Sequence, residues 1–433
     1  MDHPGPESRP PNPTTDPTGG AARASTDGPT APPASDIPGA PDSPAARRIA
    51  LRNAIEARAR ELGFALVGVA RAAASSRRAE LERWIADGKH GEMSWIAERV
   101  AEASDVRTLL RDARSVICVA DRYHDGKPDR VEGTHGRIAR YARGKDYHDL
   151  IRDRLRRLGR FVREHAPGCQ TRLTGDIHPI LEREQAARAL LGAIGKHTLL
   201  IRPGLGSYFL LGEIVTDADI AASDEAPSGD AAPADDPAHG RQVQAGHAEQ
   251  RGDTVHTVHT GHTGHTDLCG ACTRCIDACP TRAITPWSVD ATRCIAYLTI
   301  EHRGEIAPEF FGATGDWWFG CDACQEVCPH AQPTRASRRV GANPLHAPRR
   351  SSVDLLEVLG WTEEDRARLV VSSALKRATL PMMKRNALLA LASIARRDPT
   401  CAPAGRARAA AIADDAGEDP IVRSAARQCA SVA

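Results

Sequence analysis

Aromatic residues, net charge and long apolar runs are all scarce in this sequence. Tyr, Phe and Trp make up 4% of its 433 residues, while Ala and Arg abound, which indicates a coding bias rather than a fold. No apolar run approaches the ~18 residues that a membrane-spanning helix needs, so we expect no membrane partner. Lys and Arg total 57 against 56 Asp and Glu. The resulting charge of +1 gives no global attraction to nucleic acid, although a local basic patch could still provide one.

Two common nucleotide-binding signatures are also missing. There is no P-loop, and Gly204-Leu205-Gly206 lacks the following helix that a dinucleotide site needs, so nicotinamide is not the expected redox partner. Residues 1–45 have no apolar signal-peptide core. They are rich in Pro, Gly, Thr, Ser and Asp, which bury too little apolar surface to fold. We therefore expect a disordered N-terminal extension and a cytoplasmic protein.

Hydrophobic patterning divides the remaining chain into four regions. Residues 46–218 mix helical patterns with apolar, β-branched runs, which is typical of an α/β domain. The expected helices are 46–62, 77–87, 148–164 and 181–191, and the expected strands are 64–70, 115–120, 198–201 and 207–215. Residues 219–266 have no hydrophobic period and predict a flexible insert. Residues 267–335 carry most cysteines. Residues 336–433 show only helical patterns (375–396, 405–414 and 419–432), which would resemble a small HEAT-like repeat.

Eight of the twelve cysteines lie between Cys269 and Cys328. In a reducing compartment such a group holds metal rather than disulfides. The first motif, C-x2-C-x2-C-x3-C-P from Cys269, is the bacterial ferredoxin run, in which three thiolates hold one cube and the fourth serves the other. The second, C-x2-C-x3-C-P from Cys321, lacks one ligand that Cys294 can supply.

Pseudo-symmetry then predicts two [4Fe–4S] clusters in a ferredoxin-like module. One is held by Cys269, Cys272, Cys275 and Cys328, and the other by Cys279, Cys294, Cys321 and Cys324. Two zinc sites are the alternative, which the paired motifs disfavour. The insert also carries histidines at a spacing of three (His256, His259, His262, His265), which could bind a transition metal, although a low-complexity linker is the preferred interpretation. The isolated Cys118, Cys169, Cys401 and Cys429 are expected to be small buried side chains.

Ordered strings along residues 46–397 resemble the epoxyqueuosine reductases, cobalamin-dependent iron–sulfur enzymes of tRNA queuosine synthesis. The matching strings are 90–95 (HGEMSW), 140–148 (RYARGKDYH), 176–183 (DIHPILER), 195–197 (GKH), 206–213 (GSYFLLGE), 294–301 (CIAYLTIE), 320–325 (GCDACQ), 343–348 (NPLHAP) and 384–386 (KRN). The chain departs from the family at 192–195, where Trp is frequent, and at Ala296, where Ser is common.

The resemblance implies reduction of epoxyqueuosine to queuosine and water at the wobble position of a tRNA with a GUN anticodon. It implies a reductive-dehalogenase-like α/β domain that binds cobalamin, and two [4Fe–4S] clusters that feed electrons from an unidentified low-potential donor. The helical HEAT-like tail would help to hold the tRNA, and we expect a monomer. Two alternatives stay open: a cobalamin-dependent dehalogenase-like enzyme acting on a small molecule, and a simple electron carrier.

Asp176 matches the proton donor of the family. To keep a proton at neutral pH, a carboxyl group must be desolvated or crowded by negative charge; a helix N-cap is the alternative role. Candidate cobalamin contacts by position are Tyr141, His148, Asp176, Lys196, His197, Leu211, Cys321 and Asp322. Three basic groups are expected to meet tRNA phosphates, unless they are ordinary solvated faces: Arg137, Arg140, Arg143 and Lys145; Arg152, Arg154, Arg156, Arg157, Arg160 and Arg163; and Arg349, Arg350, Lys376, Arg377, Lys384 and Arg385.

Overall fold

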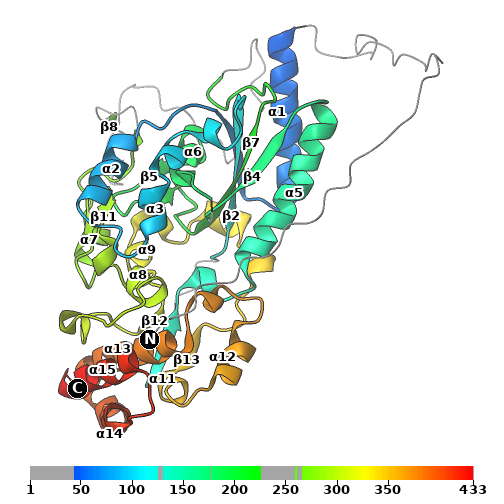
Figure 1. Cartoon of the computed structure of the whole chain (residues 1–433). Coiled ribbons are helices and arrows are strands. Elements are labelled where there is room, and N and C mark those ends of the chain that lie inside the picture. Colours follow the sequence, from blue (N-terminus) through cyan, green and yellow to red (C-terminus); the bar gives the residue numbers. More distant parts are fainter. Residues whose placement is uncertain are drawn as a thin grey trace, which may run out of the picture. The chain divides into compact units, whose positions relative to one another are not determined.

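The structure is a computed structural model that describes residues 43–124, 129, 131–176, 178–225, 259–260 and 266–432 (Figure 1). Nearly all of the predicted N-terminal extension lies outside these residues, as does most of the predicted insert with His256, His262 and His265. Across the described part of the chain, no helix combines the length and the apolarity that a bilayer crossing requires.

A four-stranded antiparallel sheet forms the centre of the N-terminal region, with the strand order β1–β2–β7–β4. The strands are β1 (Leu66–Arg71), β2 (Ser115–Arg122), β7 (Phe209–Thr216) and β4 (Thr171–Thr174). Every residue of β2 is buried, as its apolar sequence predicts for a strand covered on both faces. The mixed α/β character expected here is observed.

Helices cover both faces of this sheet (Figure 1). The pair α1 (Pro44–Glu61) and α5 (Tyr147–His165) lies on one face, and α6 (Glu182–Arg188) lies on the other. Ile55 of α1 and Leu158 of α5 share one apolar core with strand residues. Because α5 is anchored along its length in this way, the residues at its N-terminus are held in a fixed place. Further helices of the region are α2 (Arg78–Ala86), α3 (Ser94–Glu98) and α4 (Val100–Ser104).

The chain stays packed beyond residue 218, where the α/β domain was predicted to end. Ile220 and Ala222 are buried, and the Ser223 hydroxyl accepts a hydrogen bond of 2.8 Å from the amide of Val69. Glu225 adds an ion pair with Arg48 (3.0 Å). The predicted flexible insert therefore begins later than residue 219.

Three elements are shorter than the hydrophobic pattern predicts. The strand expected at 198–201 is only β6 (Leu200–Ile201), paired with β5 (Ala193–Ile194), because Thr198 turns with a φ of 66°. The helix expected at 181–191 ends early, and Leu190 has a φ of 63°. The helix expected from residue 375 begins later, as α13 (Leu380–Arg397), because Thr379 caps it and a proline occupies its first turn.

The cysteine region contains only short elements. Its helices are α7 (Arg274–Asp277), α8 (Ile295–Ile300), α9 (Ala323–Glu326) and α10 (Arg335–Val340). Its short strands are β8 (His259–Thr260), β9 (Thr266–Asp267), β10 (Ile284–Thr285) and β11 (Ser288–Val289).

A small three-stranded sheet joins three of the four predicted regions of the chain. Its order is β12–β3–β13, with β3 (His135–Ile138) in the centre. β12 (Trp317–Phe319) comes from the cysteine region and β13 (Ser352–Asp354) from the tail. Strands from separate regions of the sequence therefore pair in one sheet, which the sequence pattern did not predict.

The tail contains helices that pack around α13. Nearly the whole circumference of α13 is buried, including Leu388, Leu391 and Ile394, so this helix is the core of the tail. Its neighbours are α11 (Leu355–Val358), α14 (Ala402–Asp414) and α15 (Pro420–Val432), while α12 (Glu363–Val370) lies nearer the surface. The arrangement is helical as expected, and its HEAT-like character stays a prediction.

Candidate active site

The candidate proton donor Asp176 lies just beyond β4, and its side chain is 38% exposed. Two consecutive residues at the start of α5 hold its carboxylate. The Tyr147 hydroxyl donates to Oδ2, and the Nε2 atom of His148 lies 3.1 Å from Oδ1. The nearest following helix, α6, has Leu181 at its N-cap, so Asp176 does not act as a helix cap.

A second carboxylate holds the opposite side of the His148 ring. Asp146 caps α5 by accepting a hydrogen bond from the amide of His148 (3.1 Å), and the same Oδ1 atom lies 2.7 Å from His148 Nδ1. Lys376, from the tail, places its Nζ atom 2.6 Å from Asp146 Oδ2. These contacts form one polar chain, Lys376–Asp146–His148–Asp176, to which Tyr147 is bonded at the Asp176 end.

These contacts determine which group carries a proton. Burial opposes ionisation of Asp176, but hydrogen bonds from His148 and Tyr147 and the charge of the imidazolium lower the pKa of Asp176 below its ordinary value. Burial also opposes the charge on His148, yet Asp146 and Asp176 together raise the pKa of His148 to about 9. Without substrate or cofactor, these pKa directions favour a protonated His148 over a protonated Asp176, and the role of Asp176 as proton donor stays a prediction.

The first predicted set of cysteines lines one cavity of about 210 Å³: Cys269, Cys272, Cys275 and Cys328. Burial, followed by the charges of the other three thiols, raises the pKa of Cys275 to about 11. In a zinc site all four sulfurs lie about 2.3 Å from a single ion. A cavity of this volume suits an iron–sulfur cube better than one ion.

The second predicted set is also gathered: Cys279, Cys294, Cys321 and Cys324. Burial, then the neighbouring Cys294 and Asp322, raises the pKa of the Cys324 thiol, and Cys279 contributes in the same direction. Cys275 of the first set acts on Cys324 in the same way, so the division of the eight sulfurs into two sets of four stays a prediction. Their assignment as cluster ligands stays a prediction.

Tyr141 connects the second cysteine set to the candidate acid. Gly320, which precedes Cys321, adopts a φ of 68°, and a Cβ atom there would lie 3.4 Å from the Tyr141 ring. That ring in turn lies 5.8 Å from the ring of Tyr147, edge to face, and Tyr147 holds Asp176. The backbone therefore brings the second set and the acid to the same region of the molecule.

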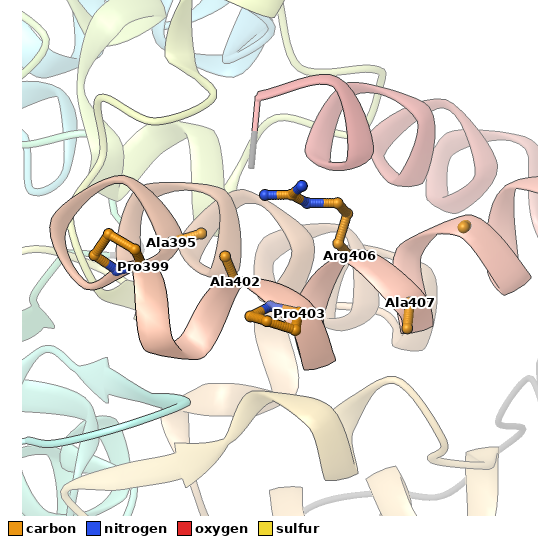
Figure 2. Close-up of a pocket in the computed structure, with 7 residues that line it drawn as sticks. Ala395, Pro399, Ala402, Pro403, Arg406 and Ala407 are labelled. Carbon is orange, nitrogen blue, oxygen red and sulfur yellow. The ribbon is translucent and has the colours of Figure 1, made fainter.

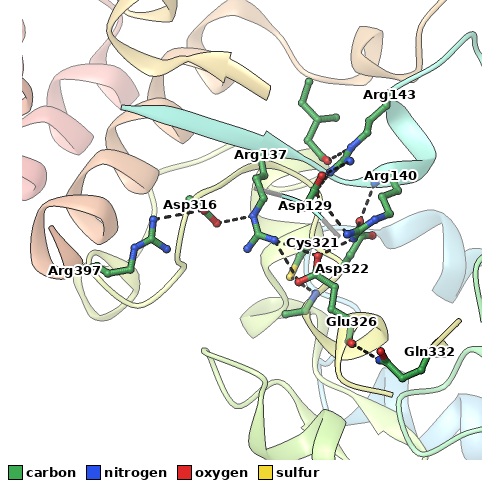
Figure 3. A network of polar contacts seen from close by, with 12 residues as sticks. Asp129, Arg137, Arg140, Arg143, Asp316, Cys321, Asp322, Glu326, Gln332 and Arg397 are labelled. Atoms are coloured by element: carbon green, nitrogen blue, oxygen red, sulfur yellow. Dashed lines mark hydrogen bonds and ion pairs between the residues drawn. The ribbon is translucent and has the colours of Figure 1, made fainter. Parts of the chain in front are cut away.

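Figure 3 shows the polar network behind this second set. Asp322, which is 1% exposed, accepts hydrogen bonds from the amide (2.8 Å) and the guanidinium (3.0 Å) of Arg140. Arg140 also binds Glu326 (2.7 Å), which Arg137 reaches from the other side (3.1 Å). Arg143 binds Asp129. The basic group predicted at 137–145 is largely an internal scaffold, so Arg140 and Arg143 cannot serve as tRNA-facing residues.

Some arginines of the other two predicted basic groups are also internal and cannot face tRNA. Arg154 is 4% exposed and binds the buried Asp121, while Arg385 is fully buried and binds backbone carbonyls. Lys384 forms an ion pair with Glu418 (2.7 Å) and is 12% exposed. Charge counts along the sequence could not separate these internal arginines from surface ones.

Three predicted cofactor contacts have other partners in the structure. Lys196 donates from its Nζ atom to the carbonyls of Gly270 (2.6 Å) and Cys272 (3.1 Å), in the loop of the first cysteine set. His197 lines the cavity of that set. Leu211 belongs to the apolar core between the sheet and α6. Their contact with a cofactor stays a prediction.

Two carboxyl groups near Asp176, the buried Glu213 and the half-buried Glu182, were missed by sequence reasoning. Burial raises the pKa of Glu213 well above its ordinary value, and Thr174 donates to its Oε2 atom (3.1 Å). Burial, opposed by Arg183 and assisted by Asp176, raises the pKa of Glu182 to about 7. Both lie inside family-like strings, at 206–213 and 176–183, so those strings were the available signal.

Two polar atoms in the region of Asp176 are left for a bound polar group to satisfy. Among the described residues, Glu213 Oε1 and His178 Nδ1 are buried and have no hydrogen-bond partner. Buried polar atoms without partners are costly, and the amide-rich rim of a corrinoid could satisfy them. Tyr141, His148 and Asp176 would then lie against it, with Cys321 and Asp322 behind Tyr141.

Another cavity, of about 570 Å³, lies elsewhere, between α13 and α14 (Figure 2). It is lined mainly by small apolar side chains, including Ala395, Pro403 and Ala407, and Arg406 is its one charged lining residue. This lining offers no acid, thiol or imidazole that could take part in electron or proton transfer.

Gathered thiolate sets beside an acid–imidazole pair define the class of the protein as an iron–sulfur oxidoreductase. Residues 268–331 match the family model of the 4Fe-4S double cluster binding domain, and residues 104–176 match that of epoxyqueuosine reductase QueG. The epoxyqueuosine reductase of Synechococcus sp. (strain RCC307) is 36% identical over 343 residues, which cover 78% of this chain and 92% of the relative. That of Escherichia coli (strain K12) is 33% identical over 339 residues, 76% and 78% of the two chains. The chain belongs to the epoxyqueuosine reductase family.

Solved structures share the same fold. An epoxyqueuosine reductase with an epoxyqueuosine-modified tRNA-Tyr stem loop superposes with a TM-score of 0.66 at 24% identity, covering 88% of this chain and 89% of the other. The Bacillus subtilis enzyme, whose catalytic aspartate loop is swung out of the active site, gives 0.64 at 24% identity, with coverages of 87% and 88%.

Proposed function

We propose that this chain reduces the epoxide of epoxyqueuosine in tRNA to the alkene of queuosine, releasing water. The observation that carries the proposal is the family membership at 32–36% identity over most of the chain, joined to an acid–imidazole pair beside the cysteine module. The dehalogenase-like alternative is not favoured, because the relatives that match along most of the chain are all epoxyqueuosine reductases.

The residues divide the chemistry between electrons and protons. When bound, two [4Fe–4S] clusters would supply low-potential electrons one at a time, and cobalamin would supply a strongly reducing, nucleophilic cobalt. Cys269, Cys272, Cys275 and Cys328 would hold one cluster, and Cys279, Cys294, Cys321 and Cys324 the other. Asp176 would donate the proton that the epoxide oxygen needs as its bond to carbon breaks. An external donor, not identified by the sequence, would deliver the electrons.

A tRNA substrate is supported by an exposed aromatic residue close to the acid. Trp95 is 41% exposed, and the Arg377 guanidinium carbon lies 5.5 Å from the centre of its ring. Glu301 holds that guanidinium through hydrogen bonds of 2.7–3.2 Å. Asp176 and Tyr147 both act on the charge of Arg377, so the pair lies near the site. Exposed aromatic and guanidinium planes bind unstacked RNA bases, and a wobble base must leave its stack to be modified.

One reaction tests the proposed function. Protein purified without oxygen, loaded with iron, sulfide and cobalamin, should convert epoxyqueuosine to queuosine in tRNA, as measured by mass spectrometry of digested nucleosides. The Asp176→Asn protein is the matched control, because Asn keeps the size of the side chain but cannot donate a proton as an acid. Dehalogenation of small halogenated organics without any queuosine formation would support the alternative instead.

The ligand sets have a separate test in the metal content. Cys294→Ala should remove one cluster and leave the other, so bound iron and acid-labile sulfide should both fall by about half. Cys118→Ala is the control, because Cys118 is fully buried in the sheet core outside both sets. If the parent protein contains zinc and no iron, and Cys294→Ala loses zinc, the cluster assignment is refuted.

A further inference from the structure

Reduction of an epoxide to an alkene and water consumes two electrons and two protons. One carboxyl group can hold only one proton, and both oxygens of Asp176 already have hydrogen-bond partners, the Tyr147 hydroxyl at Oδ2 and His148 Nε2 at 3.1 Å from Oδ1. We propose that His148, oriented by Asp146, delivers protons to Asp176, and that Lys376 holds Asp146 in place for this task. This inference rests on the proposed function and names the route by which its protons arrive.

Each nitrogen of the His148 ring contacts a carboxylate oxygen. Nδ1 lies 2.7 Å from Asp146 Oδ1 and Nε2 lies 3.1 Å from Asp176 Oδ1. Because a carboxylate only accepts, both contacts are satisfied only when the ring is doubly protonated. When Nε2 passes its proton to Asp176, the ring becomes neutral and retains the Nδ1 proton against Asp146. The ring therefore has one transferable proton, and its geometry selects Nε2.

After each transfer His148 must take up a new proton from water. The His148 ring is accessible to solvent, whereas Asp146 is not. The His148 side chain is 27% exposed, whereas that of Asp146 is 1% exposed. Lys376 covers Asp146 from the tail with an ion pair of 2.6 Å. Asp146 therefore acts as a fixed negative charge that restores the imidazolium after each transfer, by the logic of a carboxylate–imidazole pair. Asp146 and Lys376 are positioning residues, and His148 contacts the acid directly.

Tyr147 is the other group bonded to Asp176, but it is poorly suited to be the donor. Burial and then the negative charge of Asp176 raise the pKa of the phenol further above its ordinary value. The phenol accordingly keeps its proton across the physiological range and fixes the carboxylate in position. The surrounding charged groups are Asp149 and Arg152 on α5, Lys376 and Arg377 in the tail, and Glu182 on α6.

The test compares His148→Gln with His165→Gln in the loaded enzyme on epoxyqueuosine-containing tRNA. Gln keeps a hydrogen-bonding group near the carboxylates but cannot carry a transferable proton. His165 is a matched control because it lies at the far end of the same helix, where its ring stacks on Phe161. We expect kcat to fall roughly 10²- to 10⁴-fold in His148→Gln, the usual range for a lost acid–base group, with the tRNA KM unchanged. Added imidazole should restore part of the rate, because the site is exposed. A kcat within threefold of the parent protein, with the same pH profile, would overturn the proposal.

A second readout does not depend on turnover. In the cofactor-free full chain, NMR titration should give the His148 ring a midpoint near pH 9, identified as the resonance that His148→Gln removes. Asp146→Asn and Asp176→Asn should each lower that midpoint by at least one pH unit. If the parent enzyme does not reduce epoxyqueuosine, the proposed function fails. The relay is then judged by this titration, and a midpoint that neither variant moves refutes it.

Discussion

Arg385 offers a sharp test of whether the basic tail residues bind RNA or hold the tail together. Its side chain is fully buried and donates to three backbone carbonyls, those of Leu298 (2.7 Å), His302 (2.9 Å) and Gly304 (2.6 Å). Burial lowers the pKa of its guanidinium to about 10, well above physiological pH, so the charge is retained. The side chain therefore fastens α13 to the end of α8 and the loop that follows it.

The Arg385→Met substitution keeps the apolar stem and removes these donors. A hydrogen bond from a charged donor contributes about 1.5–3 kcal/mol. Because the three bonds share one group, they do not add, and we expect a loss of about 3–5 kcal/mol. With an unfolding entropy of roughly 0.8 kcal/mol/K for a chain of this length, the thermal midpoint should fall by about 4–6 °C. The assay is an anaerobic thermal melt of the cluster-loaded protein, followed by tRNA KM at a temperature where both proteins are folded.

Lys384→Met is the matched control on the neighbouring position. It removes one ion pair with Glu418, whose side chain is 17% exposed, so we expect a loss of about 1–3 kcal/mol for this one contact, less than for Arg385→Met. The KM for tRNA should stay within twofold in Arg385→Met. An unchanged thermal midpoint together with a tenfold higher KM would refute the structural role and return Arg385 to the RNA interface.

Three further outcomes are expected. Asp176→Asn should retain the iron–sulfur absorption spectrum while kcat falls by roughly 10²- to 10⁴-fold; normal turnover would exclude Asp176 as the donor. Trp95→Ala should raise the tRNA KM about 5- to 150-fold, the value of one stacked base, whereas Trp95→Phe should raise it little; Trp287→Ala, at an equally exposed tryptophan beside Lys196, is the control. Because the folded pKa of His148 is about 9 against an ordinary 6.5, its contribution to stability is complete below pH 6.5 and is lost as pH rises through 9. Urea unfolding at pH 6 and pH 9.5 should show that loss, at most about 3 kcal/mol, and His148→Gln should abolish it.

Short-range features were predictable from the sequence, and long-range ones were not. The two cysteine motifs are local, but the division of the eight cysteines into two sets pairs residues as distant as Cys269 and Cys328 and stays a prediction. The buried strand at 115–120 and the helix at 148–164 follow directly from their hydrophobic periods. The charge of Asp176 depends instead on Tyr147 and His148, which come from another element, so a motif alone could not indicate that it is ionised.

The same limit explains the misplaced basic groups. Arg140 and Arg385 look like surface charges in a sequence rich in arginine, but their partners lie far along the chain, at Asp322 and Leu298. Periodicity likewise gave no sign of the β12–β3–β13 sheet, because each of its strands is three or four residues long and comes from a different region.

The β12–β3–β13 sheet also has a consequence for folding during synthesis. Thr134, just before β3, contacts Asp354 of β13 across 220 residues of sequence. At a synthesis rate of about 5–20 residues per second, β3 leaves the ribosome roughly 10–40 s before β13 can join it. During that interval both edges of β3 begin without neighbours, a state prone to wrong pairing. All eight cysteines of the two predicted sets precede β13 in the chain, so they leave the ribosome before this sheet is complete.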